Sequence, residues 1–180
     1  DQVRKGVLIL NYVGHANDRY LADERVLDVS TINSWSNAGN LPIFVTATCE
    51  FSRFDASETS AGEYILLNPN GGGIGLFSTT RIVYAYSNYL LSKSFYQYVF
   101  EKDASGKNYR MGDVMRIAKN NTMNTLNQRN FSLLADPALR LDAIGDVLGD
   151  AFDGDRAIRA VAQRQRLFED RPGLAVEAFD

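Results

Sequence analysis

The distribution of apolar residues along the chain predicts strands that alternate with helices. Nearly continuous apolar runs at 6–13, 43–48 and 74–78 are bounded by polar or glycine-rich segments, which is typical of buried parallel strands. Apolar residues at helical spacing predict two long helices, at 84–100 and 111–126. This order of elements predicts an α/β fold, in which right-handed crossovers build a mainly parallel sheet between two layers of helices.

Capping and turn signals place two shorter helices between the strands. Ser30 is a suitable N-cap for a helix that continues to Trp35. Ser60 and Glu63 have the spacing of a capping box, in which each side chain accepts a hydrogen bond from the backbone N–H of the other residue. The glycine-rich run 71–75 precedes a strand and does not lead from a strand into a helix. We therefore interpret it as a tight turn and not as a dinucleotide-binding loop.

Residues 142–180 differ in composition from the rest of the chain. They contain no Ser, Thr, Asn, Lys or Tyr, and every basic residue among them is an arginine. We therefore expect two regions: a domain at 1–141 that ends with a short strand at 133–134 or 139–141, and a helical tail at 142–180. The break in composition favours a foreign or engineered origin for this tail. The alternative is a helical extension that packs on the sheet.

The chain has one histidine and one cysteine, and each follows a predicted strand. His15 comes just after the strand 6–13, and Cys49 directly follows the strand 43–48. The carboxyl ends of parallel strands meet at one edge of a sheet, where α/β folds bind ligands. Thiols have an ordinary pKa of about 8.5, so a neighbouring imidazole is needed to withdraw the proton and later return it to the leaving group. The pattern indicates a cysteine peptidase or acyltransferase; a buried thiol and a core histidine are the structural alternative.

Other residues near these strand ends are candidates for supporting roles. Acyl transfer needs N–H donors directed at the developing oxyanion, and the backbone N–H groups of Cys49 and Ala16 are the candidates. Glu50 is a candidate to orient the substrate or to tune the dyad, and a structural role facing solvent is the alternative. Four residues after the third strand are candidates for the specificity pocket: Thr79, Thr80, Arg81 and Tyr84. The Arg81 guanidinium suits a carboxylate-bearing substrate group, and a surface salt bridge explains it equally well.

The bulk composition limits the class of protein and its partners. The chain has 180 residues, of which 45% are hydrophobic and 23% charged, and a net charge of -3. These values are typical of a globular domain, without the basic patch that nucleic-acid binding requires. One histidine and one cysteine argue against a zinc site, and the aspartates between 146 and 155 do not fit the EF-hand spacing. We expect neither a metal nor a cofactor.

Residues 6–141 resemble the caspase-like domain of the gingipain family of cysteine peptidases. That family carries its catalytic histidine in a His-Gly step after a hydrophobic strand and its nucleophile at the end of the next strand, which correspond to His15 and Cys49. Segment 134–141 resembles the motif that ends the family's domain. Three further segments resemble the gingipain-like signal peptidase, or sortase, of the type IX secretion system: 41–55, 59–63 and 68–81.

The resemblance implies a caspase-like three-layer sandwich, incomplete at its N-terminal side, and an exported enzyme at the cell surface or outer membrane. Cys49 would be the nucleophile, His15 would move the proton, and water or an amine would capture a thioester. The implied substrate is a protein or peptide with a C-terminal sorting signal. The implied partners are an anionic lipopolysaccharide acceptor and other components of the secretion system. Ala16 stands where the family has glycine, so a catalytically inactive interaction module or a truncated piece of the enzyme remain alternatives.

Overall fold

A four-stranded sheet organises the chain, with the strand order β1-β4-β5-β6. The computed structural model describes residues 2–122 and 126–141. The strands of this sheet are β1 (Ile9–Val13), β4 (Ile43–Ala47), β5 (Gly75–Thr79) and β6 (Phe131–Leu134). The first three run parallel to one another, and β6 runs antiparallel to β5. The prediction of a mainly parallel sheet is therefore confirmed, and its last strand reverses direction.

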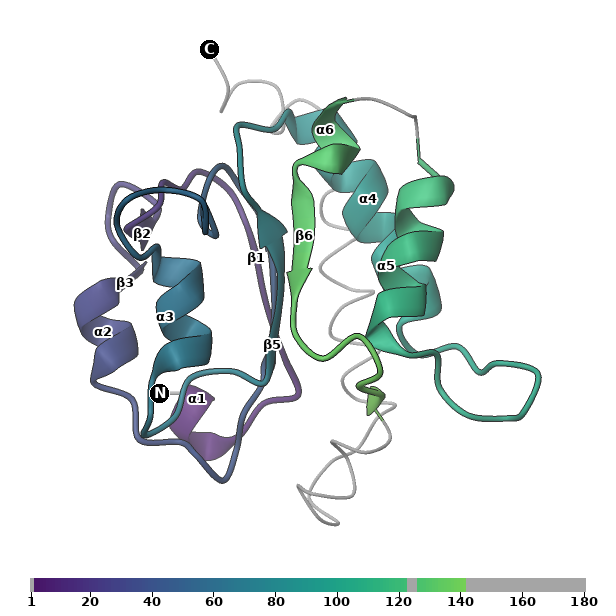
Figure 1. Cartoon of the computed structure of the whole chain (residues 1–180), viewed down its shortest axis with the longest axis horizontal. Helices are drawn as coiled ribbons and strands as arrows, with labels where there is room; N and C mark the ends of the chain where they lie inside the picture. The colour runs from purple at the N-terminus through teal and green to yellow at the C-terminus, as the bar shows by residue number, and fades with distance from the viewer. Residues whose placement is uncertain (1, 123–125, 142–180) are drawn as a thin grey trace.

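Helices cover both faces of the sheet, as Figure 1 shows. One face carries α1 (Gln2–Lys5), α2 (Val29–Asn33) and α3 (Ala61–Leu67), and the other carries α4 (Ala85–Tyr98), α5 (Met111–Asn120) and α6 (Leu126–Arg129). Successive strand residues point to opposite faces, so one strand contributes to two cores. Phe44 of β4 packs in the cluster that includes Ile65 of α3, whereas Val45 packs in the cluster that includes Phe95 of α4. The three-layer arrangement is confirmed.

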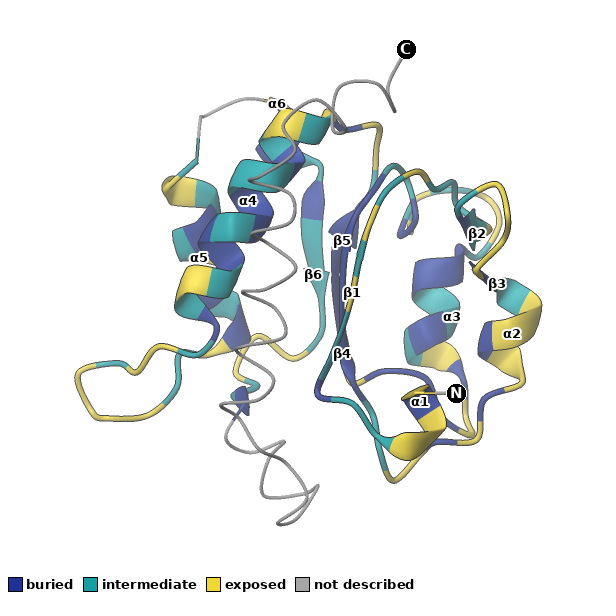
Figure 2. Cartoon of the chain, turned by 180° about the vertical axis from the view of Figure 1, so that it is seen from behind, coloured by how far each residue is buried: buried dark blue, intermediate teal, exposed yellow. Residues whose placement is uncertain are grey.

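The central strands and the first strand differ in burial (Figure 2). Every residue of β4 and β5 is buried, as expected for strands covered on both faces. In β1, Asn11 and Val13 are exposed. The prediction of a buried strand over 6–13 is wrong on this point, because β1 is shorter and lies at the edge of the sheet described. An apolar run alone does not distinguish a central strand from an edge strand.

The turn signals around α3 are confirmed. The Ser60 hydroxyl accepts a hydrogen bond from the Glu63 N–H, and the Glu63 carboxylate accepts one from the Ser60 N–H at 2.8 Å. The glycine run forms the tight turn between α3 and β5. Gly72 has a φ of +98°, and a Cβ atom there would lie 2.0 Å from the carbonyl oxygen of Ile65. Only glycine fits this position without moving the backbone.

Several element ends differ from the prediction. Helix α2 begins one residue after Asp28, whose carboxylate accepts the N–H of Thr31, so that Asp28 and not Ser30 is the N-cap. Helix α5 ends at Asn120, before the predicted end at 126, and the Thr122 hydroxyl donates to carbonyl oxygens of its last turn. The final strand begins at Phe131, two residues before the predicted start at 133.

A short hairpin and the C-terminal region complete the description. The strands β2 (Tyr20–Leu21) and β3 (Leu27–Asp28) pair antiparallel just after the first sheet strand, and neither is long enough to show a period of two. The helical tail predicted at 142–180 lies outside the described residues. Within the described part of the chain, no helix combines the length and the apolar character needed to cross a membrane.

Candidate active site

The carboxyl ends of β1 and β4 lie next to each other. The two strands pair in parallel, with Val13 opposite Ala47, and the Gly14 N–H continues the pairing by donating to the carbonyl oxygen of Ala47 at 3.4 Å. His15 and Cys49 each stand two residues beyond this last pair. The strand register therefore brings the two segments that carry them to the same edge of the sheet.

His15 is exposed on a segment of otherwise half-buried residues, and neighbouring groups fix its backbone. Its carbonyl oxygen accepts hydrogen bonds from the Tyr12 hydroxyl and from the Ala22 N–H, both at 2.9 Å. The chain then turns back through the β2–β3 hairpin. Because His15 is exposed, the structural alternative of a core histidine does not describe this residue.

Ala16, the candidate oxyanion donor next to His15, forms an isolated bridge with Leu21. The two hydrogen bonds of this bridge run from Asn17 N–H to Tyr20 and from Ala22 N–H to His15. Neither uses the N–H of Ala16, which stays out of the hydrogen bonding of the hairpin. The position therefore meets the first requirement for an oxyanion donor, an N–H that the fold does not consume there.

Cys49 is half-buried, and its Sγ atom lies 3.7 Å from the carbonyl oxygen of Val83. The residue that follows it, Glu50, has a φ of +54°, in the left-handed region. This conformation costs a residue with a side chain roughly 1–2 kcal/mol. The Glu50 N–H donates to the carbonyl oxygen of Arg81 at 3.4 Å, and its carbonyl oxygen accepts the Arg53 N–H at 3.1 Å. The thiol therefore lies on a sharp turn, residues 48–52, which we call the cysteine turn. Hydrogen bonds to residues at and just after the end of β5 hold this turn in place.

Thr79 and Thr80 use their hydroxyl groups inside the protein. Thr79 is fully buried, and its Oγ1 donates to the carbonyl oxygen of Thr48, directly before the cysteine. Thr80 Oγ1 donates to the carbonyl oxygen of Asn130 at 3.2 Å. The structure therefore brings Thr79 to the cysteine turn, where its hydroxyl contacts the backbone from the interior of the protein. Thr80 joins the end of β5 to the segment before β6.

Arg81 forms an ion pair with Asp55 on the loop that follows the cysteine. Its two terminal nitrogens contact the two carboxylate oxygens, with an Nη1–Oδ1 distance of 2.8 Å. The hydrogen bonds from this guanidinium lower the pKa of Asp55 to about 2. The alternative of a surface salt bridge thus accounts for the contacts of Arg81. Glu50 likewise pairs with Arg53, at 3.4 Å.

The sequence prediction missed the residues that hold the cysteine turn. Asp55 lies 26 positions from Arg81, and Ser52 lies 27 positions from the Thr79 carbonyl oxygen that its hydroxyl contacts at 3.0 Å. Contacts over such separations leave no periodic signal in a single sequence. The one available signal was the density of polar residues between 50 and 59, which predicts a loop and not its partners.

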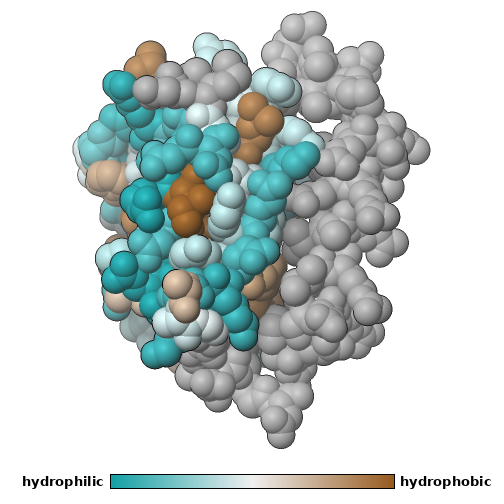
Figure 3. Space-filling view, turned by 90° about the vertical axis from the view of Figure 1, so that its right-hand side faces the viewer, coloured by the Kyte–Doolittle hydropathy of each residue, from teal (hydrophilic) through white to brown (hydrophobic). Residues whose placement is uncertain are grey.

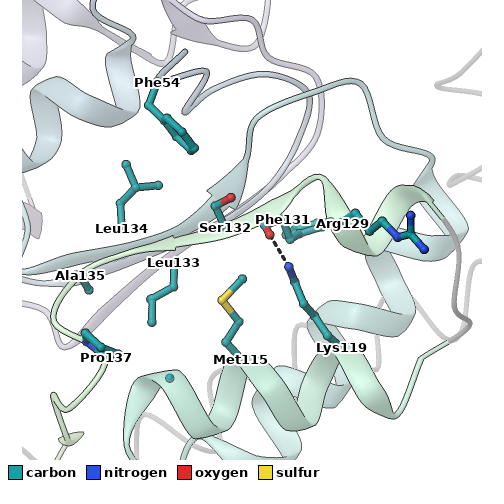
Figure 4. A pocket seen from close by; sticks show the side chains of 11 residues that line it. Phe54, Met115, Lys119, Arg129, Phe131, Ser132, Leu133, Leu134, Ala135 and Pro137 are labelled. Carbon is teal, nitrogen blue, oxygen red and sulfur yellow. Dashed lines mark hydrogen bonds between the residues drawn. The ribbon is translucent and has the colours of Figure 1, made fainter.

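A groove in the described part of the chain lies away from these residues, beside β6. It has a volume of about 600 Å³ and is lined by residues of β6, α5 and the Phe54 loop (Figure 4). Lys119 donates to the carbonyl oxygen of Phe131 at 2.6 Å, and partial burial lowers its pKa. On the side of the molecule that faces the viewer in Figure 3, the described residues that can be seen are mainly hydrophilic, with separate hydrophobic side chains among them. None of the predicted site residues lines this groove.

No metal centre emerges from residues 2–122 and 126–141, where His, Cys, Asp and Glu side chains form no group of three that could hold an ion. The chemistry available at the strand ends is that of a thiol, an imidazole and backbone N–H groups. This set is sufficient for nucleophilic acyl transfer, in which the base activates the nucleophile and the N–H groups stabilise the oxyanion.

Comparisons with known proteins agree with this chemistry. The sequence model of peptidase family C25 matches residues 1–142, well over half of the chain. The solved structure of the Arg-specific cysteine proteinase gingipain R (RgpB) has 15% identity and a TM-score of 0.67, over 77% of this chain and 34% of that one. The complex of the Porphyromonas gingivalis RgpB pro- and mature domains has 14% identity and a TM-score of 0.68, over 76% of this chain and 34% of that one.

A third solved structure, described only as a protease, has 15% identity and a TM-score of 0.65, over 77% of this chain and 36% of that one. No curated protein matches the sequence. The chain therefore spans about a third of the length of the solved structures that it resembles. At these identities the likeness establishes the fold, with the mixed sheet and the helices on both of its faces.

Proposed function

Because the chain belongs to peptidase family C25, we propose that it carries the catalytic chemistry of a cysteine endopeptidase. The observation that supports this most strongly is the parallel pairing of β1 with β4, which brings His15 and Cys49 to one edge of the sheet. In this proposal Cys49 is the nucleophile and His15 is the general base and acid. The substrate is a protein or peptide.

The reaction proceeds in two acyl-transfer steps. His15 withdraws the thiol proton, and the Cys49 sulfur adds to the scissile carbonyl carbon while the N–H groups of Cys49 and Ala16 stabilise the oxyanion. The tetrahedral intermediate collapses to a thioester, and the amine leaves with the proton from His15. Water, or an acceptor amine, then gives its proton to His15 and attacks the thioester, which releases the thiol.

The proposed substrate class is exported cargo with a C-terminal sorting signal. The resemblance of segments 41–55, 59–63 and 68–81 to the type IX secretion sortase supports this choice. These segments contain the cysteine turn and the glycine-rich turn that leads from α3 into β5. On this proposal the enzyme acts at the cell surface or outer membrane, among other secretion components, and lipopolysaccharide provides the acceptor amine when the thioester is not hydrolysed.

A second candidate is a caspase-like interaction module without turnover. One observation favours it: Ala16 occupies the position at which the resembled family has glycine. Alanine still provides an N–H, but with a side chain it adopts positive φ angles far less readily than glycine does. The two candidates differ in whether the thiol forms a thioester.

The test is to incubate the full chain with a cargo protein that ends in a sorting signal, in the presence of a small amine, and to identify the products by mass spectrometry. We expect wild-type protein to release the signal and to form both the free acid and the amide. The Cys49→Ser variant should form neither, and Ser57→Ala, an exposed change on the same loop, should behave as wild type.

The outcomes separate the levels of the proposal. Cleavage that depends on Cys49 but not on the sorting signal would overturn the substrate class and keep the peptidase. If no cleavage is found and Cys49 forms no thioester with the cargo protein, the peptidase proposal is contradicted and the interaction module is favoured.

A further inference from the structure

A buried hydroxyl group contacts the peptide bond that leads into Cys49. Thr79 is fully buried at the end of β5, and its Oγ1 donates a hydrogen bond to the carbonyl oxygen of Thr48. The same peptide unit consists of the Thr48 carbonyl and the Cys49 N–H. Thr79 thus touches the group that the proposed mechanism uses as an oxyanion donor, but from the opposite side.

The planarity of the peptide bond links the two ends of this unit. The carbonyl and the N–H of a trans peptide lie in one plane and point in opposite directions, and only the flanking ψ and φ angles rotate easily. A rotation of the whole plane would reverse the N–H while it disturbs little else of the chain path. Holding the Thr48 oxygen therefore fixes the direction of the Cys49 N–H.

Neighbouring hydrogen bonds fix the backbone around this peptide unit. The carbonyl oxygen of Thr79 accepts both the N–H of Ser52, at 2.9 Å, and its hydroxyl, at 3.0 Å. Glu50 N–H donates to the carbonyl oxygen of Arg81 at 3.4 Å. The segment from Thr48 to Ser52 is thus bonded to the end of β5 at successive points, and the Thr79 hydroxyl is the contact that acts on the peptide before the thiol.

We propose that Thr79 is a positioning residue, which fixes the direction of the Cys49 N–H so that it can stabilise the oxyanion. This inference rests on the proposed function of Cys49. The hydroxyl does not touch the substrate, and it takes no part in proton transfer. Its effect should appear only in reactions that pass through a tetrahedral oxyanion.

Two thiol reagents separate this role from a general loss of structure. A peptidyl chloromethyl ketone reacts through a tetrahedral adduct whose oxygen needs the oxyanion donors, whereas iodoacetamide alkylates the thiol directly by displacement of iodide. Removal of one oxyanion donor lowers kcat by about 100- to 1000-fold in known cases. Loosening a donor should cost less, so we expect Thr79→Val to lower the ketone rate by about 10- to 100-fold. The iodoacetamide rate should stay nearly unchanged.

Two variants serve as controls. Thr79→Ser keeps the hydroxyl and should restore the wild-type ratio of the two rates. Thr46→Val removes another buried hydroxyl, which bonds to Ser78 at 2.5 Å and does not contact the cysteine turn, so its ratio should remain that of the wild type. Thr79→Ala replaces Thr79→Val if the valine variant does not fold, because it removes the hydroxyl without adding bulk.

The inference is overturned if Thr79→Val changes both rates equally or changes neither while the protein stays folded. The proposed function fails separately, if wild-type Cys49 reacts with the ketone no faster than the His15→Ala variant does. A wild-type ketone reaction that depends on His15, together with an unchanged Thr79→Val ratio, would refute the role of Thr79 alone.

Discussion

The two strand ends of the candidate site are built in different ways. The cysteine turn follows β4, which is buried along its whole length, and bonds from the end of β5 hold it. The histidine follows β1, at the edge of the sheet described, and is exposed on a segment that the Tyr12 hydroxyl and a small hairpin support. A nucleophile with an oxyanion donor needs a fixed backbone, whereas a base needs a side chain that can reach the thiol. The difference in support matches the difference in proposed role.

The largest effect on stability is expected at the glycine turn before β5, which lies at the opposite end of the parallel strands β4 and β5 from Cys49. Gly72→Ala should destabilise the protein by about 2–4 kcal/mol, because the new Cβ meets the Ile65 carbonyl oxygen and the residue has a positive φ. Gly39→Ala is the matched control, since a Cβ there meets nothing within 4 Å, and it should change stability by less than about 0.5 kcal/mol. Urea unfolding of both variants measures the difference, and equal midpoints would contradict the account of this turn.

The histidine end should tolerate the loss of its hydroxyl contact. Burial, together with the nearby Glu24 carboxylate, raises the pKa of Tyr12, so its hydroxyl remains a donor to the His15 carbonyl at neutral pH. Tyr12→Phe should cost about 0.5–1.5 kcal/mol, the usual net value of one hydrogen bond. The Ala22 N–H still holds the same carbonyl, so we expect a smaller loss of kcat than for Thr79→Val. Steady-state kinetics on both variants measure the two losses of kcat. A larger loss for Tyr12→Phe than for Thr79→Val would contradict the proposed difference between the two strand ends.

The smallest effect on stability concerns the ion pair between Asp55 and Arg81, which joins the loop after Cys49 to the segment that follows β5. The folded pKa of Asp55 is lowered to about 2 from its ordinary 3.8, so the folded state favours the carboxylate. This stabilisation is present above the ordinary value and is lost as pH falls through the folded value of about 2. The pair is exposed, so the contribution is small.

Asp55→Asn should therefore be less stable than wild type near neutral pH, and the two should converge near pH 2. Asp23→Asn, an exposed change in the hairpin at the histidine end, is the control and should follow the wild-type curve. Urea midpoints measured across this pH range provide the test. A constant difference between Asp55→Asn and wild type at every pH would show that the ion pair is not its cause.

Much of the fold was predictable because its signals are local. The apolar runs of β4 and β5 and the Ser60–Glu63 capping box depend on residues that are close in sequence, and the structure contains all of them. The edge position of β1 and the reversed direction of β6 depend on which strands pair. Neither property is encoded in the strand's own sequence, so the pattern of apolar residues could not provide it.

The same distinction between local signals and long-range contacts applies to the candidate site. His15 and Cys49 could be identified because each is unique in composition and follows a strand. Thr79 was expected in a specificity pocket, but its hydroxyl faces the carbonyl of Thr48, 31 positions away. That contact follows from the parallel alignment of β4 and β5, which the sequence does not specify to the residue. A single sequence indicated the reactive groups but not their supports.

The most direct test of the central claim is the pH dependence of Cys49 alkylation by iodoacetamide in the wild type and in the His15→Ala variant. If the two residues form a dyad, the wild-type rate should change little between about pH 8 and pH 6, because the imidazolium stabilises the thiolate. The rate for His15→Ala should fall by about tenfold for each pH unit below the ordinary thiol pKa. Parallel curves for the two proteins would contradict the dyad and with it the proposed mechanism.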